Sequence, residues 1–168
     1  GKVYLDGSFT PHLLRGLGRA GLGMVKVGLE GEPLARAFGP VWAPLAQSAP
    51  SAEWAAYGVA CQLLSGPSKL HIDCKAVLTV LAKQRAPQLS AKNIHAGYVR
   101  AAWSEQGKGF IQKLWKVKAH VQWRGADLTE DELVKAKGNE EADEAAKLGA
   151  ERHDLADSEV SKAAEESM

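Results

Sequence analysis

Four acidic residues stand where an unpaired carboxylate would be costly to bury. Asp6 closes the apolar run VYLD, and Asp73 closes a second run, KLHID. Glu53 lies in the first turn of the apolar segment AEWAAYGVACQLL, and Asp143 lies within GNEEADEAAK. Carboxylates without partnering histidine or thiolate ligands favour Mg²⁺ or Mn²⁺ over Zn²⁺. If the acids cluster, they predict a site for two divalent cations of the kind that hydrolyses phosphodiesters.

Taken singly, each acid also has a structural explanation. Asp6 and Asp73 can cap turns, and Glu53 can favour a helix N-terminus electrostatically. Asp143 can be an ordinary solvated acid. A cluster is favoured because strands joined by a parallel crossover end at the same edge of a sheet, where a helix can bring its first turn.

The apolar pattern predicts the elements that would position these acids. Strands are expected at residues 3–6, 18–28, 33–42, 69–73 and 110–120. Helices are expected at 52–64 with Ser51 as N-cap, at 74–84 and 91–106, in a short segment opened by a capping box of Thr129 and Glu132, and in a last alanine-rich segment after Gly138. This order predicts an α/β fold with a five-stranded mixed sheet flanked by helices.

Length and composition predict one globular domain. The chain has 168 residues, with Lys+Arg 21 against Asp+Glu 20, so a polyanionic partner must be held by a local basic patch. Residues 1–150 are expected to form the domain, and 151–168 a polar extension that is helical or disordered. Two cysteines without paired spacing, no leader before the first strand and no apolar run of about 20 residues predict an excised intracellular domain, cytoplasmic or nuclear, without membrane contact.

The stretch GLGRAGLG, residues 16–23, contains the spacing G-x-G-x-x-G. A dinucleotide site needs such glycines between a strand and a helix, whereas MVKV continues here as a strand. The simpler explanation is that the glycines relieve crowding in a hairpin or at a strand start. The favoured expectation is that a backbone without side chains lets a bulky ligand lie close to the sheet.

Five motifs in order, LDGS, SAEWAAYGVA, HIDCKAVL, VKAH and GNEEADEAAK, resemble the type 1 ribonuclease H domain, including the versions attached to reverse transcriptases of retroelements. The resemblance runs from about Val3 to Ala150. It implies a ribonuclease H-like fold and an endonuclease that hydrolyses the RNA strand of RNA/DNA hybrids with two Mg²⁺ ions, or Mn²⁺, leaving 3'-hydroxyl and 5'-phosphate ends. An RNA/DNA hybrid is then the expected partner, and a fused or associated reverse transcriptase is a further one.

The resemblance also implies roles for individual residues. Asp6, Glu53, Asp73 and Asp143 match the catalytic, metal-binding carboxylates. His120 matches a mobile-loop histidine that aids proton transfer or product release, although an ordinary loop histidine is the alternative. The expected substrate contacts are Gly7, Ser8, Ser48, Asn139, Lys116 and Lys118. Of these, Asn139 is expected to open the last helix, and Ser48 is expected to hold a substrate phosphate. The alternative for Ser48 is an ordinary loop serine without a functional role.

The chain departs from the family pattern in three places. Cys74 stands where many members have serine and is expected to be a small packed residue. Residues 121–138 form a longer segment than in the shortest members and are expected to carry their own helix. The basic, tryptophan-bearing protrusion of some members is not evident around residues 87–103.

Either basic residues of this chain or a fused partner domain therefore have to supply much of the substrate affinity. Lys113, Lys116, Lys118 and Arg124 interleave with Trp115 and Trp123, a pattern compatible with phosphate contact and base stacking. Packing of Trp115 in the core is an equal alternative.

Two other classes of function remain open. A catalytically silent ribonuclease H-like scaffold would bind nucleic acid or protein, and such modules usually lose acids. A structural domain would pair its acids with basic side chains. Related nucleases fit less well: a proofreading exonuclease needs an acid at Ser8, and an integrase needs its last acid soon after Asp73.

Overall fold

The fold is known from a computed structural model that describes residues 1–11, 17–42, 47–83, 97, 99–100, 102, 109–153 and 165. Five strands form one sheet in the order β3-β2-β1-β4-β5. The strands are β1 (Lys2–Thr10), β2 (Arg19–Val27), β3 (Pro33–Pro40), β4 (Ser68–Ile72) and β5 (Ile111–Lys116). The helices are α1 (Ala49–Leu63), α2 (Lys75–Leu81) and α5 (Glu130–Glu151).

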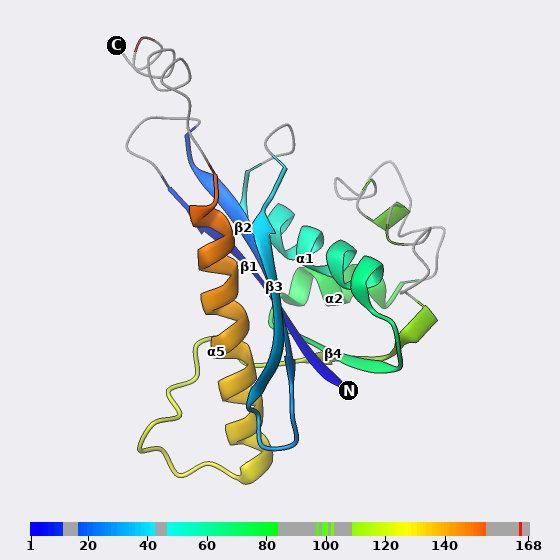
Figure 1. Cartoon of the computed structure of the whole chain (residues 1–168), viewed down its shortest axis with the longest axis vertical. Helices are drawn as coiled ribbons and strands as arrows, with labels where there is room; N and C mark the ends of the chain where they lie inside the picture. Colours follow the sequence, from blue (N-terminus) through cyan, green and yellow to red (C-terminus); the bar gives the residue numbers. More distant parts are fainter. Residues whose placement is uncertain are drawn as a thin grey trace.

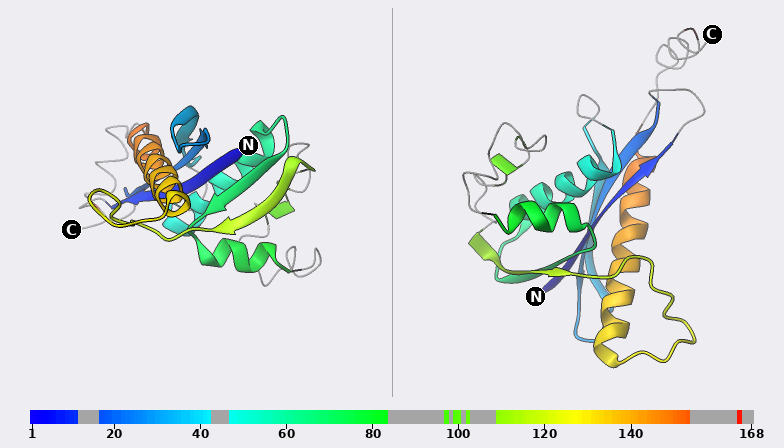
Figure 2. Two further views of the ribbon diagram at one scale, coloured as in Figure 1. Left: turned by 90° about the horizontal axis from the view of Figure 1, so that it is seen from below. Right: turned by 180° about the vertical axis from the view of Figure 1, so that it is seen from behind.

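The sheet is mixed, as predicted. Strands β1, β2 and β3 pair antiparallel, whereas β4 pairs parallel with both β1 and β5. Helix α5 crosses one face of the sheet, and α1 and α2 lie on the other (Figures 1 and 2). The predicted α/β architecture of a five-stranded mixed sheet flanked by helices is confirmed.

Alternation along β1 supplies both layers of the core. Val3 and Leu5 pack into the larger apolar cluster with Trp54 and Tyr57 of α1. Tyr4 points to the opposite face, where it joins a cluster that contains alanines of α5. Successive side chains of a strand point to opposite faces, so one strand can bury a residue in each layer.

The glycines of β2 make room for α5. A Cβ on Gly23 would lie against the backbone of α5, 2.6 Å from the carbonyl oxygen of Ala142. Gly21 meets the helix backbone in the same way, at Ala146 and Ala150. Gly21 and Gly23 therefore relieve crowding, but the crowding comes from a helix and not from a hairpin or a strand start as expected. The favoured expectation of a ligand close to the sheet is not met at these two glycines, because α5 lies there. Gly16 lies outside the described residues.

Helix α1 begins three residues before the predicted start. Ser48 is the N-cap, and its Oγ accepts a hydrogen bond of 3.2 Å from the Ser51 backbone N–H. The prediction of Ser51 as N-cap is wrong. Pro50 stands in the first turn, where its missing N–H costs no hydrogen bond.

Helix α5 is continuous from Glu130 to Glu151, so the predicted break at Gly138 is wrong. Gly138 is instead a packing residue, because a Cβ there would lie 2.5 Å from the ring of Tyr4. The predicted capping box is present: the Glu132 N–H donates to Thr129 Oγ1 at 3.2 Å, and the Thr129 N–H donates to Glu132 Oε2 at 3.0 Å. Residues 121–138 therefore carry the start of α5 and no separate helix.

Two strands differ most in length from the prediction, and β2 and β3 are each two residues shorter than predicted. Strand β1 continues beyond Asp6 to Thr10 because its antiparallel pairing with β2 extends that far. Strand β5 ends at Lys116, before His120. Most of the predicted helix at 91–106, most of residues 87–103 and nearly all of the predicted extension at 151–168 lie outside the described residues.

No helix in the described part of the chain is long and apolar enough to cross a membrane.

The close approach of β2 and α5 predicts the effect of adding a methyl group there. Gly23→Ala should lower the free energy of unfolding by about 1 to 3 kcal/mol, because the new Cβ must displace the helix backbone. Gly39→Ala in β3 is the matched control, since a Cβ there meets nothing within 4 Å. Urea unfolding would measure both, and equal stability of the two variants would contradict the packing described here.

Candidate metal centre

The pairing of β1 with β4 brings two acids to one place. The parallel ladder ends with Leu5 opposite Ile72, and the next residues along the two strands are Asp6 and Asp73. The prediction that Asp6 ends its strand is wrong, because β1 continues to Thr10. Asp6 lies instead directly after the last residue of β1 that pairs with β4. The two carboxylates meet there as the parallel register requires.

Gly7 brings the third acid. A Cβ on Gly7 would lie 2.5 Å from the backbone nitrogen of Glu53 and 2.6 Å from the carbonyl carbon of Ala52. The first turn of α1 therefore rests directly on β1, which only glycine allows at this position. The Gly7 N–H also donates a hydrogen bond of 2.9 Å to Asp6 Oδ1. Its predicted contact with substrate stays a prediction.

Carboxylate oxygens of Asp6, Glu53 and Asp73 all lie within 4.8 Å of one another. The Asp6 side chain is buried, and Glu53 Oε2 is buried without a hydrogen-bond partner among the described residues. In the same part of the chain, none of the three acids forms a salt bridge. A structural domain that neutralises its acids with basic side chains would show such bridges.

Burial dominates the electrostatics of this acidic triad, Asp6, Glu53 and Asp73. Burial, together with the nearby charge of Asp73, raises the pKa of Asp6 to about 7. Burial, followed by the charge of Asp6, also raises the pKa of Glu53. Burial raises the pKa of Asp73, although the charge of Lys116 opposes that shift. The metal-free cluster therefore holds protons near neutral pH, where a divalent cation would replace them.

The triad fits a hard divalent cation. It offers oxygen ligands from three elements, and one of these oxygens is buried without a partner among the described residues. Oxygen-only sites of this type suit Mg²⁺ or Mn²⁺, whereas Zn²⁺ sites use histidine or cysteine ligands.

Asp143 lies beside the triad but outside the group of close oxygens. The charge of Asp143 raises the pKa of both Asp6 and Asp73, so Asp143 lies on the side of α5 near the triad. Its side chain, 17% exposed, forms an ion pair of 2.8 Å with Lys147, one turn further along α5. The structure thus brings three of the four predicted acids together and places the fourth next to them.

His120 and Asn139 share a small polar cavity with Asp143. The cavity has a volume of about 120 Å³ and is also lined by Val121, Gln122, Ala136 and Glu140. His120 is exposed, and its charge lowers the pKa of Asp73, which places it near the triad. Asn139 lies in the interior of α5 and does not open the helix, so that prediction is wrong. Its Oδ1 is buried without a partner among the described residues.

The other predicted substrate contacts have structural partners of their own. Ser48 caps α1, and Ser8 pairs with Gly21 in the β1–β2 ladder. Lys116 Nζ donates to the carbonyl oxygen of Val117 at 2.6 Å, while its charge acts on Asp73. Lys118 is exposed beside a cavity of about 260 Å³. Contact of these residues with substrate stays a prediction.

Both tryptophans of the basic segment are covered by side chains of the protein itself. Trp115 stacks with His71 at a centroid distance of 6.4 Å, and Lys113 Nζ lies 3.8 Å from the centre of its ring. Arg124 lies 4.2 Å from the ring of Trp123. Each ring therefore has a partner within the protein, but both rings are only partly buried and neither belongs to the buried core, so base stacking stays a prediction.

Two residues near the site were missed in the sequence. Lys147 pairs with Asp143 at the spacing i,i+4, which is a recognisable helix signal. Glu140 binds Trp123 and Arg124, which are 17 and 16 residues away, and no local pattern indicates that contact. Cys74 is half-buried and packs against the larger apolar cluster, as predicted.

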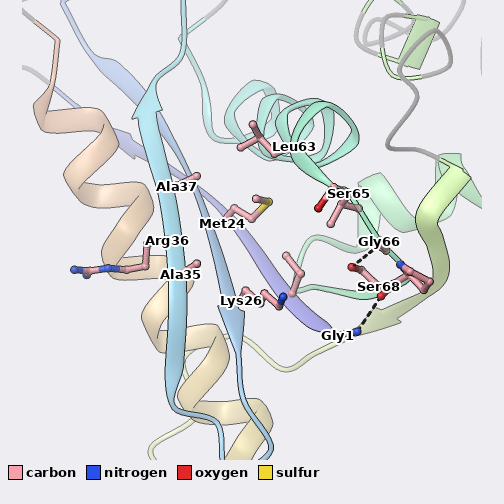
Figure 3. A pocket seen from close by; sticks show the side chains of 13 residues that line it. Gly1, Met24, Lys26, Ala35, Arg36, Ala37, Leu63, Ser65, Gly66 and Ser68 are labelled. Carbon is pink, nitrogen blue, oxygen red and sulfur yellow. Dashed lines mark hydrogen bonds between the residues drawn. The ribbon is translucent and has the colours of Figure 1, made fainter.

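A further cavity lies away from these acids. It has a volume of about 380 Å³ and lies at the start of β1 (Figure 3). Its lining includes Val3, Met24 and Leu63, with Lys26 and the loop around Ser68. None of the described residues that line it is acidic, so they offer no ligands of the kind found at the triad.

No protein-family model and no curated protein sequence matches the chain. Solved structures do match it. The solution structure of the prototype foamy virus RNase H domain has a TM-score of 0.64 and 20% identity, over 90% of this chain and 94% of that one. Foamy viral protease-reverse transcriptase in complex with RNA/DNA hybrid has a TM-score of 0.60 and 18% identity, over 89% of this chain but 20% of that one. RNase H1 from the archaeon Halobacterium salinarum has a TM-score of 0.51 and 19% identity, over 90% and 98%.

These likenesses show that the chain has the ribonuclease H-like fold. The predicted fold class is confirmed, and the resemblance read from the five motifs extends to the architecture. The chain spans about a fifth of the length of the viral protease-reverse transcriptase.

The raised pKa of Asp6 predicts how stability depends on pH without divalent cations. The Asp6 carboxyl ionises near 3.8 in the unfolded chain and near 7 in the fold, so the folded state binds more protons between these values. The free energy of unfolding should therefore fall as pH rises from about 4 to 7, by up to about 1.4 kcal/mol per pH unit for one proton. Urea titrations in a chelator would measure the slope.

Asp131→Asn is a control for that measurement, because Asp131 is exposed and its pKa is lowered by Lys135. It should keep the slope of the unaltered protein, whereas Asp6→Asn should flatten it. Equal slopes for all three proteins would contradict the electrostatics described here.

Removing one charge from the triad should stabilise the metal-free protein. At pH 8 in a chelator, Asp6→Asn should raise the free energy of unfolding by about 1 to 3 kcal/mol, because it relieves repulsion between buried carboxylates and keeps an acceptor for the Gly7 N–H. Thermal unfolding in chelator and in Mg²⁺ would measure this. A variant less stable than the unaltered protein in chelator would contradict the assignment.

Proposed function

We propose that this chain is an endonuclease that hydrolyses the RNA strand of RNA/DNA hybrids and leaves 3'-hydroxyl and 5'-phosphate ends. The observation that carries the proposal is the buried triad of Asp6, Glu53 and Asp73, whose oxygens lie within 4.8 Å of one another and form no ion pair in the described part of the chain. The ribonuclease H-like fold supports it, as does the foamy viral protein of similar fold that was solved with an RNA/DNA hybrid.

The acids hold the metal ions in this proposal. Asp6, Glu53 and Asp73 supply oxygen ligands, and Asp143 turns from Lys147 to complete the set. When bound there, two Mg²⁺ or Mn²⁺ ions supply an activated water and neutralise the charge that develops on the leaving oxygen. The burial that raises the pKa of Asp6 and Glu53 also keeps bulk water from screening their attraction for the ions.

Neighbouring polar groups act on the substrate. His120 protonates the leaving oxygen or assists product release in this proposal, which is supported by the small cavity that it lines together with Asp143. Lys116 and Lys118 hold phosphates as point charges, since both lie on the segment that leads from β5 toward His120. Ser48 and Ser8 contribute hydroxyl groups, and Gly7 and Asn139 contribute backbone and amide groups close to the acids.

Selection of a hybrid follows from backbone contacts. The enzyme senses 2'-hydroxyl groups on one strand and a DNA backbone on the other, with little sequence preference. Trp115 and Trp123 each have a cation of the protein beside the ring, so the proposal does not depend on base stacking.

The natural context of the domain is proposed from the comparisons. The chain covers only 20% of the foamy viral protease-reverse transcriptase, and it is similar in fold to a foamy virus RNase H domain solved by itself. A fused or associated reverse transcriptase, working inside the cell, is therefore the proposed partner besides the hybrid.

Cleavage of an end-labelled RNA/DNA hybrid in Mg²⁺ tests the function. The protein should degrade only the RNA strand of the hybrid and leave single-stranded RNA, duplex RNA and duplex DNA intact. Asp6→Asn should reduce the rate by at least about 10²-fold, because an amide is a neutral and weaker ligand for the ions. Asp131→Asn, the same change at an exposed acid, should keep the rate within about twofold.

Two outcomes would contradict the function. An intact hybrid, with folded protein and Mn²⁺ also tried, would favour a silent nucleic-acid or protein-binding scaffold. Cleavage that survives Asp6→Asn would mean that the activity does not come from the acidic triad.

A further inference from the structure

The loop that joins β5 to α5, residues 117–129, carries His120 and is hydrogen-bonded to the middle of α5 through Trp123 and Arg124. We call it the histidine loop. Trp123 Nε1 donates a hydrogen bond of 3.0 Å to Glu140 Oε2. Arg124 donates two more to the same carboxylate, Nη1 to Oε1 at 2.8 Å and Nη2 to Oε2 at 3.1 Å. Glu140 therefore accepts three hydrogen bonds from two adjacent residues of the loop.

The contact fixes orientation as well as position. A forked guanidinium pairs with a carboxylate in one plane, and the indole N–H adds a third direction. Arg124 also lies 4.2 Å from the ring of Trp123, and Lys137 Nζ lies 5.1 Å from that ring. The hydrogen bond from Arg124 lowers the pKa of Glu140, so the carboxylate stays ionised at neutral pH. One exposed ion pair alone would contribute little, but this one is joined to a hydrogen-bonded, stacked indole.

Glu140, which accepts these hydrogen bonds, lies on the stretch of α5 that faces the proposed active site. Glu140 follows Asn139 directly and stands three residues before Asp143. All three line the cavity of about 120 Å³ that His120 also lines. His120 has a φ of 52°, a left-handed conformation that is uncommon outside glycine. Such a conformation persists only where the surrounding structure imposes it.

We propose that Glu140 is a positioning residue: through Trp123 and Arg124 it holds the histidine loop so that His120 faces Asp143 and the acidic triad. We call this contact the Glu140 latch. Its effect on catalysis rests on the proposed function, but its effect on the loop does not. Glu140 is not one of the clustered acids, so in this proposal it touches neither metal nor substrate directly. Loss of the latch therefore lowers kcat and leaves KM for the hybrid and the affinity for metal unchanged.

The test compares Glu140→Gln with Glu144→Gln. Glu144 is an exposed acid one turn further along α5, and its charge acts on Arg124 without a hydrogen bond to it among the described residues. In metal-free protein, Glu140→Gln should speed amide hydrogen exchange across residues 117–129 by roughly tenfold, while Glu144→Gln should change it by less than about twofold. Arg124→Lys keeps the charge but not the fork, and should give an intermediate increase.

The kinetic arm uses a double-mutant cycle with His120→Ala on the RNA/DNA hybrid. Glu140→Gln should lower kcat without raising KM, and should have no further effect in protein that already lacks His120, because it acts through that residue. Glu144→Gln should leave both constants unchanged.

The outcomes separate this inference from the proposed function. Unchanged hydrogen exchange in Glu140→Gln would overturn the latch. A loosened loop with unchanged kcat, or a loss of activity that multiplies with that of His120→Ala, would overturn its positioning role. If the unaltered protein cleaves no hybrid while Glu140→Gln still loosens the loop, the proposed function is wrong and the latch is supported.

Discussion

The site depends on the parallel pairing of β1 with β4. Because Leu5 stands opposite Ile72, the two residues that follow, Asp6 and Asp73, are adjacent where the strands diverge. A shift of one residue would send one carboxylate to the other face of the sheet. The bare backbone of Gly7 then lets α1 approach closely enough to add Glu53. A register and a close approach thus create the cluster, and neither requires the acids to attract one another.

The carboxylates of the triad repel one another, and basic side chains outside the triad reduce this repulsion only in part. Lys116 and His120 lower the pKa of Asp73, and Lys147 pairs with Asp143, yet no described cation binds the triad directly. Burying like charges costs stability that hydrophobic packing elsewhere must supply. Such an arrangement is typical of a site prepared for a bound cation, because the metal ion turns the repulsion into ligand binding.

Local signals in the sequence predicted much of this structure. The strand patterns, the capping box at Thr129 and the apolar surroundings of the acids indicated a mixed sheet with carboxylates at one edge. Features set by tertiary contact were missed. Gly138 looked like a helix end but receives the ring of Tyr4, and the glycines of β2 looked open to a ligand but receive α5. The contact of Glu140 with Trp123 spans 17 residues, so no helical spacing could indicate it.

The most direct test of the account is the position of manganese in crystals of the protein soaked in Mn²⁺, located by anomalous scattering. The account predicts a peak within about 2.5 Å of carboxylate oxygens from Asp6, Glu53 and Asp73, with Asp143 turned toward it. Crystals of the Asp6→Asn variant, soaked in the same way, should show no such peak. Crystals of the unaltered protein without manganese at the triad, at millimolar concentration and pH 8, would contradict the claim that these acids form a metal centre.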